Sequence, residues 1–136
     1  MPTLEPFCTI TAEMAPTMLG AMPDGFRIDF PFSGTATGPH WEGELPVVGT
    51  DHGRVRKDGT VVLDITARIG EGADSVFYTA TGLALPTETR GDADPHELLM
   101  FETANDDLAF LNRSIGVAFG ESRGTTLTLE VYLAKK

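Results

Sequence analysis

The sequence predicts an all-β fold that closes into an antiparallel barrel or a sandwich. Short segments of alternating apolar and polar residues run along most of the 136-residue chain, and this period of two is typical of strands with one buried face. Gly, Pro and Asp separate the segments at roughly 8–12-residue intervals, as in strands joined by tight turns. So many short strands favour closure, because closure removes exposed strand edges.

The strand pattern is clearest in three segments, 26–32, 60–68 and 126–133, each with an apolar and a polar face. In the first of them the apolar face is mostly aromatic, which packs well on a pleated surface. About 8–10 strands are expected in all, taken in chain order from segments 5–13, 26–32, 34–38, 41–47, 52–57, 60–69, 75–83, 97–103, 113–120 and 125–134.

Turns and one short helix complete the predicted domain, which spans residues 1–136. The Asp58-Gly59 pair predicts a hairpin, because glycine tolerates the positive φ of a two-residue turn. Acidic residues at the start of Asn105–Asn112 suit the positive end of a short helix, which we expect to plug or flank the barrel. Segment Pro86–Pro95, rich in Thr, Gly and Asp, is predicted to be a mobile loop.

The charge balance excludes several kinds of partner. Twenty acidic and ten basic side chains give a net charge of −10, which repels phosphate backbones and anionic lipid, so we expect no nucleic-acid partner. No apolar run of about 18 residues and no signal-like N-terminal segment occurs, so we expect neither a membrane span nor export. The lone Cys8 has no internal disulfide partner, and a reducing cytoplasm is the expected compartment.

No strong catalytic or cofactor motif occurs in the chain. A Walker loop, a dinucleotide fingerprint, a His-Glu-x-x-His pair and a nucleophile elbow are all missing from the sequence, so we expect no cofactor. A metal site needs two of His40, His52 and His96 to converge with a carboxylate such as Asp51. Because no pair has ligand spacing, we expect imidazoles at the surface or at a pocket rim instead.

Two groups of polar residues are candidates for proton chemistry. Asp51 and His52 lie between two predicted strands, where a loop at a barrel mouth would bring a carboxylate and an imidazole together; the alternative is an ordinary polar turn. Asp64, Thr66 and Arg68 share one strand face. If that face looks into the barrel, pairing or a ligand must compensate their burial. The usual apolar filling of small barrels favours an outward orientation.

Asn112 and Arg113 lie where the predicted helix meets the next strand. Their amide and guanidinium donors suit a carboxylate or a developing oxyanion. Alternatively, they tie the helix to the barrel rim through main-chain carbonyls. The sequence leaves both interpretations open.

Several motifs resemble one known family in order and spacing: Gly38-Pro39-His40-Trp41-Glu42-Gly43, Gly49-Thr50-Asp51-His52, Asp58-Gly59, Leu63-Asp64 to Arg68, Phe101-Glu102-Thr103 and Leu111-Asn112-Arg113. From about Phe7 to Tyr132 the chain resembles the bacterial and fungal proteins grouped as domain of unknown function 3237. The resemblance implies a compact, calycin-like antiparallel barrel, with recurring polar positions at Asp51, Asp64, Asn112 and Arg113. The chain departs from the pattern at His52, usually aromatic, and at Phe77, commonly Tyr.

Three functions compete at this stage. In the first, a cofactor-independent isomerase, cyclase or lyase acts on a carbonyl-bearing or polyketide-like molecule: Asp51 or His52 takes a proton, and Asn112 with Arg113 stabilises the enolate. In the second, a non-catalytic barrel binds a small hydrophobic acid through Arg113. In the third, a solid barrel serves as a scaffold or oligomerisation module, and a homodimer is one possible state. The expected ligand contacts are Phe26, Phe30, His40, Trp41, Tyr78 and Glu102.

Overall fold

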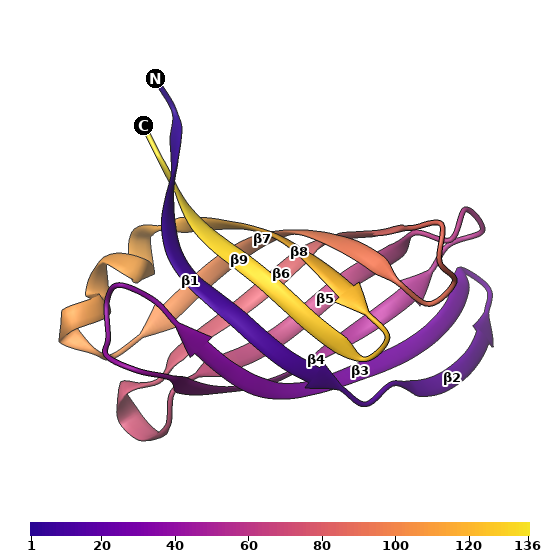
Figure 1. The fold of residues 1–136 in the computed structure, drawn as a ribbon, viewed down its shortest axis with the longest axis horizontal. Helices are drawn as coiled ribbons and strands as arrows, with labels where there is room; N and C mark the ends of the chain where they lie inside the picture. The colour runs from indigo at the N-terminus through magenta and orange to yellow at the C-terminus, as the bar shows by residue number, and fades with distance from the viewer.

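The computed structural model describes all 136 residues and shows a closed, antiparallel β-barrel (Figure 1). Neighbouring strands pair in the order β1-β9-β8-β7-β6-β5-β4-β3-β2, and an additional β1–β3 pairing closes the sheet into a barrel of eight strands, with β2 outside the closure. The fold prediction is therefore confirmed. The strands are β1 Thr3–Met14, β2 Thr17–Met22, β3 Gly25–Thr37, β4 Leu45–Val55, β5 Val61–Ile69, β6 Val76–Pro86, β7 Ala93–Thr103, β8 Ile115–Arg123 and β9 Thr126–Lys135.

Strand β3 joins two of the predicted segments, 26–32 and 34–38, into one. Pro31 does not interrupt it, because Pro31 lies between the part of β3 that pairs with β2 and the part that pairs with β1. Its carbonyl faces this junction and accepts the Ala15 N–H at 2.8 Å, so the missing proline N–H costs no ladder hydrogen bond. Strand β2 was not predicted.

Strand β4 likewise joins much of the predicted segments 41–47 and 52–57. The prediction that a strand begins at 41 is wrong, since residues 38–44 form turns and bends at one end of the barrel. The predicted loop is shorter than expected, because β6 extends to Pro86 and β7 begins at Ala93. Its mobility stays a prediction.

The predicted short helix is present as a 3₁₀ helix, η2, at Asp106–Arg113. Asn105 caps it by accepting the Asp107 N–H at 3.0 Å. A second short segment, η1, spans Gly72–Asp74. None of these helices is long or apolar enough to cross a bilayer.

The two ends of the barrel differ. η2 covers one end (Figure 1), where Leu108 and Leu111 join the apolar core that also contains Phe7 and Phe101. The opposite end carries the turns after β4, β6 and β8 and the projecting strand β2. One end of the barrel is therefore packed under η2, and the opposite end carries only turns and β2.

Candidate functional site

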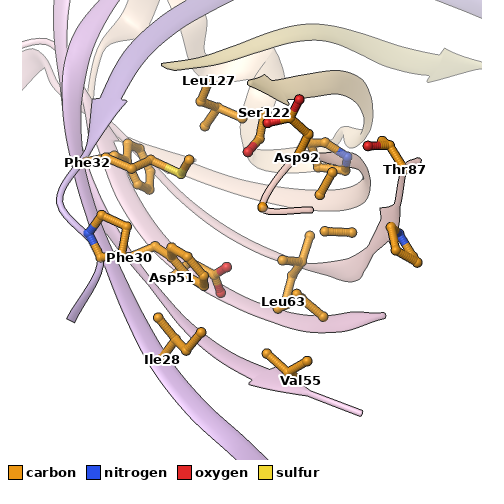
Figure 2. A pocket seen from close by; sticks show the side chains of 18 of the residues that line it. Ile28, Phe30, Phe32, Asp51, Val55, Leu63, Thr87, Asp92, Ser122 and Leu127 are labelled. Atoms are coloured by element: carbon orange, nitrogen blue, oxygen red, sulfur yellow. The ribbon is translucent and has the colours of Figure 1, made fainter. Parts of the chain in front are cut away.

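A cavity of about 710 Å³ occupies the open half of the barrel, within the size range of small-molecule sites. Figure 2 shows the labelled apolar side chains Ile28, Phe30, Val55 and Leu63 arranged around it, with Thr87, Asp92 and Ser122 nearby. Its apolar walls come from several strands and include Met14, Phe26, Phe32, Val61, Ile65, Ala84, Leu127 and Leu129. A mostly apolar ligand fits such a lining.

Asp51 is the acidic residue on the inward face of β4. Its neighbours on that face, Gly49 and Gly53, leave room for aromatic rings of β3: a Cβ on Gly49 would lie 2.7 Å from Phe32 Cζ, and one on Gly53 2.9 Å from Phe30 Cε2. Phe30 and Asp51 are also directly opposite in the β3–β4 ladder. The two glycines thus let the rings of Phe30 and Phe32, which form an aromatic wall, pack beside the Asp51 carboxylate.

Asp51 is only 7 % exposed, and its Oδ1 accepts the main-chain N–H of Asp64 at 2.9 Å. Burial raises the pKa of Asp51 to about 6, although this hydrogen bond opposes the shift. Asp51 is therefore largely ionised at neutral pH, but close enough to its pKa to accept and return a proton.

A second carboxyl group, that of Glu97 on β7, also lines the cavity. It is 4 % exposed, and its Oε1 is buried without a hydrogen-bond partner in the protein. Burial, reinforced by the charge of Asp51, raises the pKa of Glu97 to about 8. Glu97 is therefore mainly protonated at neutral pH and can donate a hydrogen bond.

Tyr78 on β6 supplies a third buried polar group. Its side chain is 2 % exposed and lines the cavity, and its Oη has no hydrogen-bond partner in the protein. Burial and the nearby Glu97 raise the pKa of Tyr78 well above its ordinary value. The phenol stays protonated and is a hydrogen-bond donor.

Asp51, Glu97 and Tyr78 together combine one ionised carboxylate with two neutral O–H donors inside an apolar cavity. Pairs of titratable groups whose surroundings push their pKa values apart are typical of acid–base sites. No cluster of three or more His, Cys, Asp or Glu side chains suited to a metal ion occurs in the structure. The chemistry that the side chains themselves support is proton transfer.

Four of the sequence-predicted residues line the cavity, namely Phe26, Phe30, Asp51 and Tyr78. His52 does not join Asp51, because the structure places it on the outer face of β4, where its Nδ1 lies 2.9 Å from Asp29 Oδ1. The loop predicted at Asp51 and His52 is instead part of the continuous strand β4, and consecutive residues of a strand point to opposite faces of the sheet. Asp64 is exposed on the outer face of β5, as expected because small barrels usually fill their interiors with apolar side chains.

Asn112 and Arg113 lie in η2, at the packed end and outside the cavity lining. The Asn112 side chain accepts the Thr103 N–H at 2.8 Å and donates to the Thr103 carbonyl at 3.0 Å. It thus ties the helix to the end of β7, the alternative that the sequence left open. Arg113 is exposed beside it, too far along the barrel to act as the predicted oxyanion donor.

Three expected ligand contacts are also outside the cavity lining. His40 is exposed at the packed end, with its ring centroid 5.1 Å from that of Phe110. Trp41 donates its indole N–H to the Ala36 carbonyl at 3.1 Å. Glu102 is exposed on β7. The turn that carries His40 and Trp41 closes the barrel end away from the cavity, which the sequence did not indicate.

Glu97 is the site residue that sequence reasoning missed. It shares the inward face of β7 with Pro95, Leu99 and Phe101, all buried, so a lone acid on an apolar face was the available signal. That signal was obscured because the outer face carries Leu98 and Met100, which are 57 % and 64 % exposed. With apolar residues on both faces, alternation alone does not identify the inner one.

Comparison with known proteins supports the fold. A family model described as protein of unknown function (DUF3237) matches residues 2–134, and no curated protein matches the chain. A crystal structure of a protein of unknown function from Clostridium acetobutylicum aligns with a TM-score of 0.85 at 19 % identity, covering 99 % of this chain and 100 % of the other. A β-barrel-like protein from Acinetobacter baumannii also aligns at 0.85, with 17 % identity and coverage of 99 % and 97 %.

A fungal protein shares the barrel less closely. The structure of a Penicillium herquei protein, described as an enzyme, aligns with a TM-score of 0.67 at 17 % identity, covering 98 % of this chain and 95 % of the other. Similarity at these identities shows a common fold.

Proposed function

Because the chain belongs to the DUF3237 family, whose description assigns no activity, we propose a function from the site itself: a cofactor-independent isomerase, cyclase or lyase. Its substrate in this proposal is a small, mostly apolar, carbonyl-bearing molecule of the polyketide-like kind, held in the barrel cavity. The reaction is proton transfer next to the carbonyl group. The Penicillium herquei protein described as an enzyme makes catalysis on this fold a reasonable expectation.

The observation that carries the proposal is the trio of Asp51, Glu97 and Tyr78 within one apolar cavity. Glu97 Oε1 and Tyr78 Oη are buried without protein partners, and an unpaired buried donor is costly unless a ligand satisfies it. A carbonyl oxygen accepts two hydrogen bonds and meets that need. The apolar walls hold the rest of the molecule and exclude water, which strengthens each polar contact.

Each residue has a role in the proposed reaction. The Asp51 carboxylate removes a proton from the carbon beside the carbonyl, the electron pair of that C–H bond forms a C=C bond, and the π pair of the carbonyl group moves to its oxygen. Protonated Glu97 and the Tyr78 hydroxyl donate hydrogen bonds to the developing enolate oxygen. Protonated Asp51 returns the proton to another carbon of the enolate in an isomerase. In a cyclase the enolate carbon bonds to a second carbonyl carbon of the same molecule, and the oxygen of that carbonyl takes the proton. In a lyase the enolate re-forms the carbonyl group and expels a leaving group from the β-carbon, and the leaving group takes the proton.

A non-catalytic carrier of small hydrophobic acids fits the cavity less well. Arg113, the residue expected to pair with a ligand carboxylate, lies outside the cavity, and Arg90 on the loop after β6 is the one cation among the lining residues. An acid bound deep in the barrel would face Asp51 and Glu97 with no counter-charge. A carrier function fits only ligands whose carboxylate stays at the mouth of the barrel.

The proposal is tested with β-tetralone, a neutral apolar ketone with acidic C–H groups. Its exchange of hydrogen for deuterium in deuterium oxide is followed by NMR at neutral pH. We expect the wild type to accelerate exchange, Asp51→Asn to abolish the acceleration, and Glu97→Gln and Tyr78→Phe to reduce it. Glu102→Gln, on the outer face of β7 and outside the cavity lining, is the matched control and should behave as wild type. Equal rates for Asp51→Asn and wild type contradict the proposal.

A further inference from the structure

We infer that the barrel cavity selects its ligands by charge and binds lipophilic ammonium ions, that is, apolar amines, more tightly than the corresponding neutral alcohols or carboxylates. This site shares its residues with the proposed function but rests on binding alone. An amine that fills the cavity would compete with the carbonyl substrate. The proposal thus names a chemical class of ligand, a monocation with an apolar body.

The charges that line the cavity are the first argument. Besides Tyr78, whose phenol stays neutral, four ionisable side chains contribute to it, three acidic and one basic: Asp51, Asp92 and Glu97, and Arg90. Arg90 and Asp92 belong to the loop between β6 and β7 at the mouth, whereas Asp51 and Glu97 lie on strands and are almost fully buried. The deep part of the cavity therefore has acids and no cation.

The second argument is that neither deep acid has a cationic partner. Asp51 accepts a main-chain N–H, and Glu97 Oε1 has no partner in the protein. All four ion pairs of the protein involve other residues. The cost of burying the charged Asp51 carboxylate is thus already incurred in the free protein, and an ammonium group that enters gains its attraction without adding that cost.

The aromatic wall is the third argument. Phe26, Phe30 and Phe32 on β3 and Tyr78 on β6 line the same cavity as the two acids, and Figure 2 shows Phe30 beside Asp51. Aromatic faces attract cations, more strongly where water is excluded. An apolar amine would find both a counter-charge and aromatic surface, whereas an acid of the same shape would find like charge.

Charge selection also predicts a proton signal. Because Glu97 is mainly protonated near neutral pH, an ammonium ion beside it favours loss of its proton. Binding of an amine should then release protons to the buffer, and binding of a neutral alcohol should release few or none.

The test uses three ligands of nearly equal size, phenethylamine, phenethyl alcohol and phenylacetate, titrated calorimetrically into the full chain at neutral pH. We expect the amine to bind at least about tenfold tighter than the alcohol, and the carboxylate to bind most weakly. Repeating the amine titration in buffers of different ionisation enthalpy measures the released protons. An alcohol that binds as tightly as the amine, or a carboxylate that binds tightest, overturns the inference.

Variants assign the effect to the two acids. Asp51→Asn with Glu97→Gln should remove most of the advantage of the amine over the alcohol, while Asp74→Asn with Glu102→Gln, both exposed and outside the cavity lining, should keep it. An unchanged advantage in the first pair overturns the inference, and the wild-type ligand series decides it if that pair does not fold. A wild type that does not prefer the amine but still accelerates β-tetralone exchange contradicts only this inference. A wild type that prefers the amine but does not accelerate exchange contradicts only the proposed function.

Discussion

The Asp51 side chain, inside the barrel, accepts a 2.9 Å hydrogen bond from the main-chain N–H of Asp64 on the neighbouring strand, whose own side chain is exposed outside. The bond lies at an interruption of the β4–β5 ladder, which pairs Asp51 with Ile65 and resumes only at Arg54 and Val62. A buried carboxylate thus replaces a missing ladder acceptor. This hydrogen bond to the main chain of β5 fixes the orientation of the Asp51 side chain.

Substitutions at Asp51 should therefore separate its structural and chemical roles. Asp51→Asn keeps a side-chain oxygen for the Asp64 N–H, whereas Asp51→Ala leaves that donor unpaired, which costs about 1–3 kcal/mol. We expect both variants to lose β-tetralone exchange, with Asn more stable than Ala by about that amount in urea unfolding. An alanine variant as stable as the asparagine variant would show that the hydrogen bond contributes nothing.

The rate of proton transfer should depend on pH with two limbs. Asp51 must be ionised to accept a proton, so the rate should rise as pH increases through about 6. Glu97 must be protonated to donate, so the rate should fall above about 8. The two values belong to the coupled pair. The pH profile of kcat/KM checks this, and Glu97→Gln should lose the alkaline limb while keeping the acidic one.

Stability should decrease as pH rises, because Glu97 has a higher pKa in the folded than in the unfolded chain. Between these two pKa values the folded state binds more protons than the unfolded state. The contribution of Glu97 to the free energy of unfolding is therefore complete below about pH 4.5 and is lost as the pH rises through about 8. One such group contributes a slope of up to about 1.4 kcal/mol per pH unit. Thermal unfolding of Glu97→Gln should show a flatter profile than wild type.

Glu102→Gln is the matched control for this experiment. Glu102 lies on the same strand but is exposed on its outer face, so its neutral variant should retain the wild-type dependence of stability on pH. A Glu97→Gln profile as steep as that of Glu102→Gln would assign the effect to another group.

Sequence alternation predicted the strands of the barrel and the shared apolar face of Phe26 and Phe30, because the apolar residues of β3 keep mainly to one face. Asp51 was predicted in a loop, and its place on the inward face of β4 follows only from the structure. Alternation could not place Glu97, since β7 carries apolar residues on both faces. Choosing between those faces requires the closed barrel.

Neighbours in the sequence were a poor guide to neighbours in space. Asp51 and His52 were paired on the expectation of a loop, but the strand continues through both and sends His52 outside. The error with Asn112 and Arg113 has a different cause. Nothing in a strand pattern tells which end of a barrel is packed and which is open, and η2 covers the packed one.

The exposed apolar residues on the outer face of β7 and β8 relate to the expected homodimer, which stays a prediction. Met100 pairs with Ile115, and Leu98 with Val117, so their side chains form a continuous strip. Leu98, Met100, Ile115 and the nearby Phe119 are all exposed. Analytical ultracentrifugation of the wild type and of Met100→Lys measures how many subunits each protein has in solution.

Glycine at position 53 should set the position of the aromatic wall. A Cβ there would lie 2.9 Å from Phe30 Cε2 and 3.1 Å from Val61 Cγ1, so Gly53→Ala must displace one of these side chains. Such overpacking costs about 1–3 kcal/mol, and a shifted Phe30 would narrow the cavity beside Asp51. We expect weaker phenethylamine binding in calorimetry, with unchanged binding in Gly43→Ala, in the turn at the packed end of the barrel, used as a distant comparison.

Asn112 provides the clearest contrast between a structural and a catalytic role. Its two hydrogen bonds to the Thr103 main chain hold η2 on the barrel end, so Asn112→Ala should lower the free energy of unfolding by about 1–2 kcal/mol. β-Tetralone exchange at a temperature where the variant is fully folded should match wild type, because the side chain never reaches the cavity. Loss of exchange with unchanged stability would return Asn112 to the catalytic site and move the reaction to the packed end of the barrel.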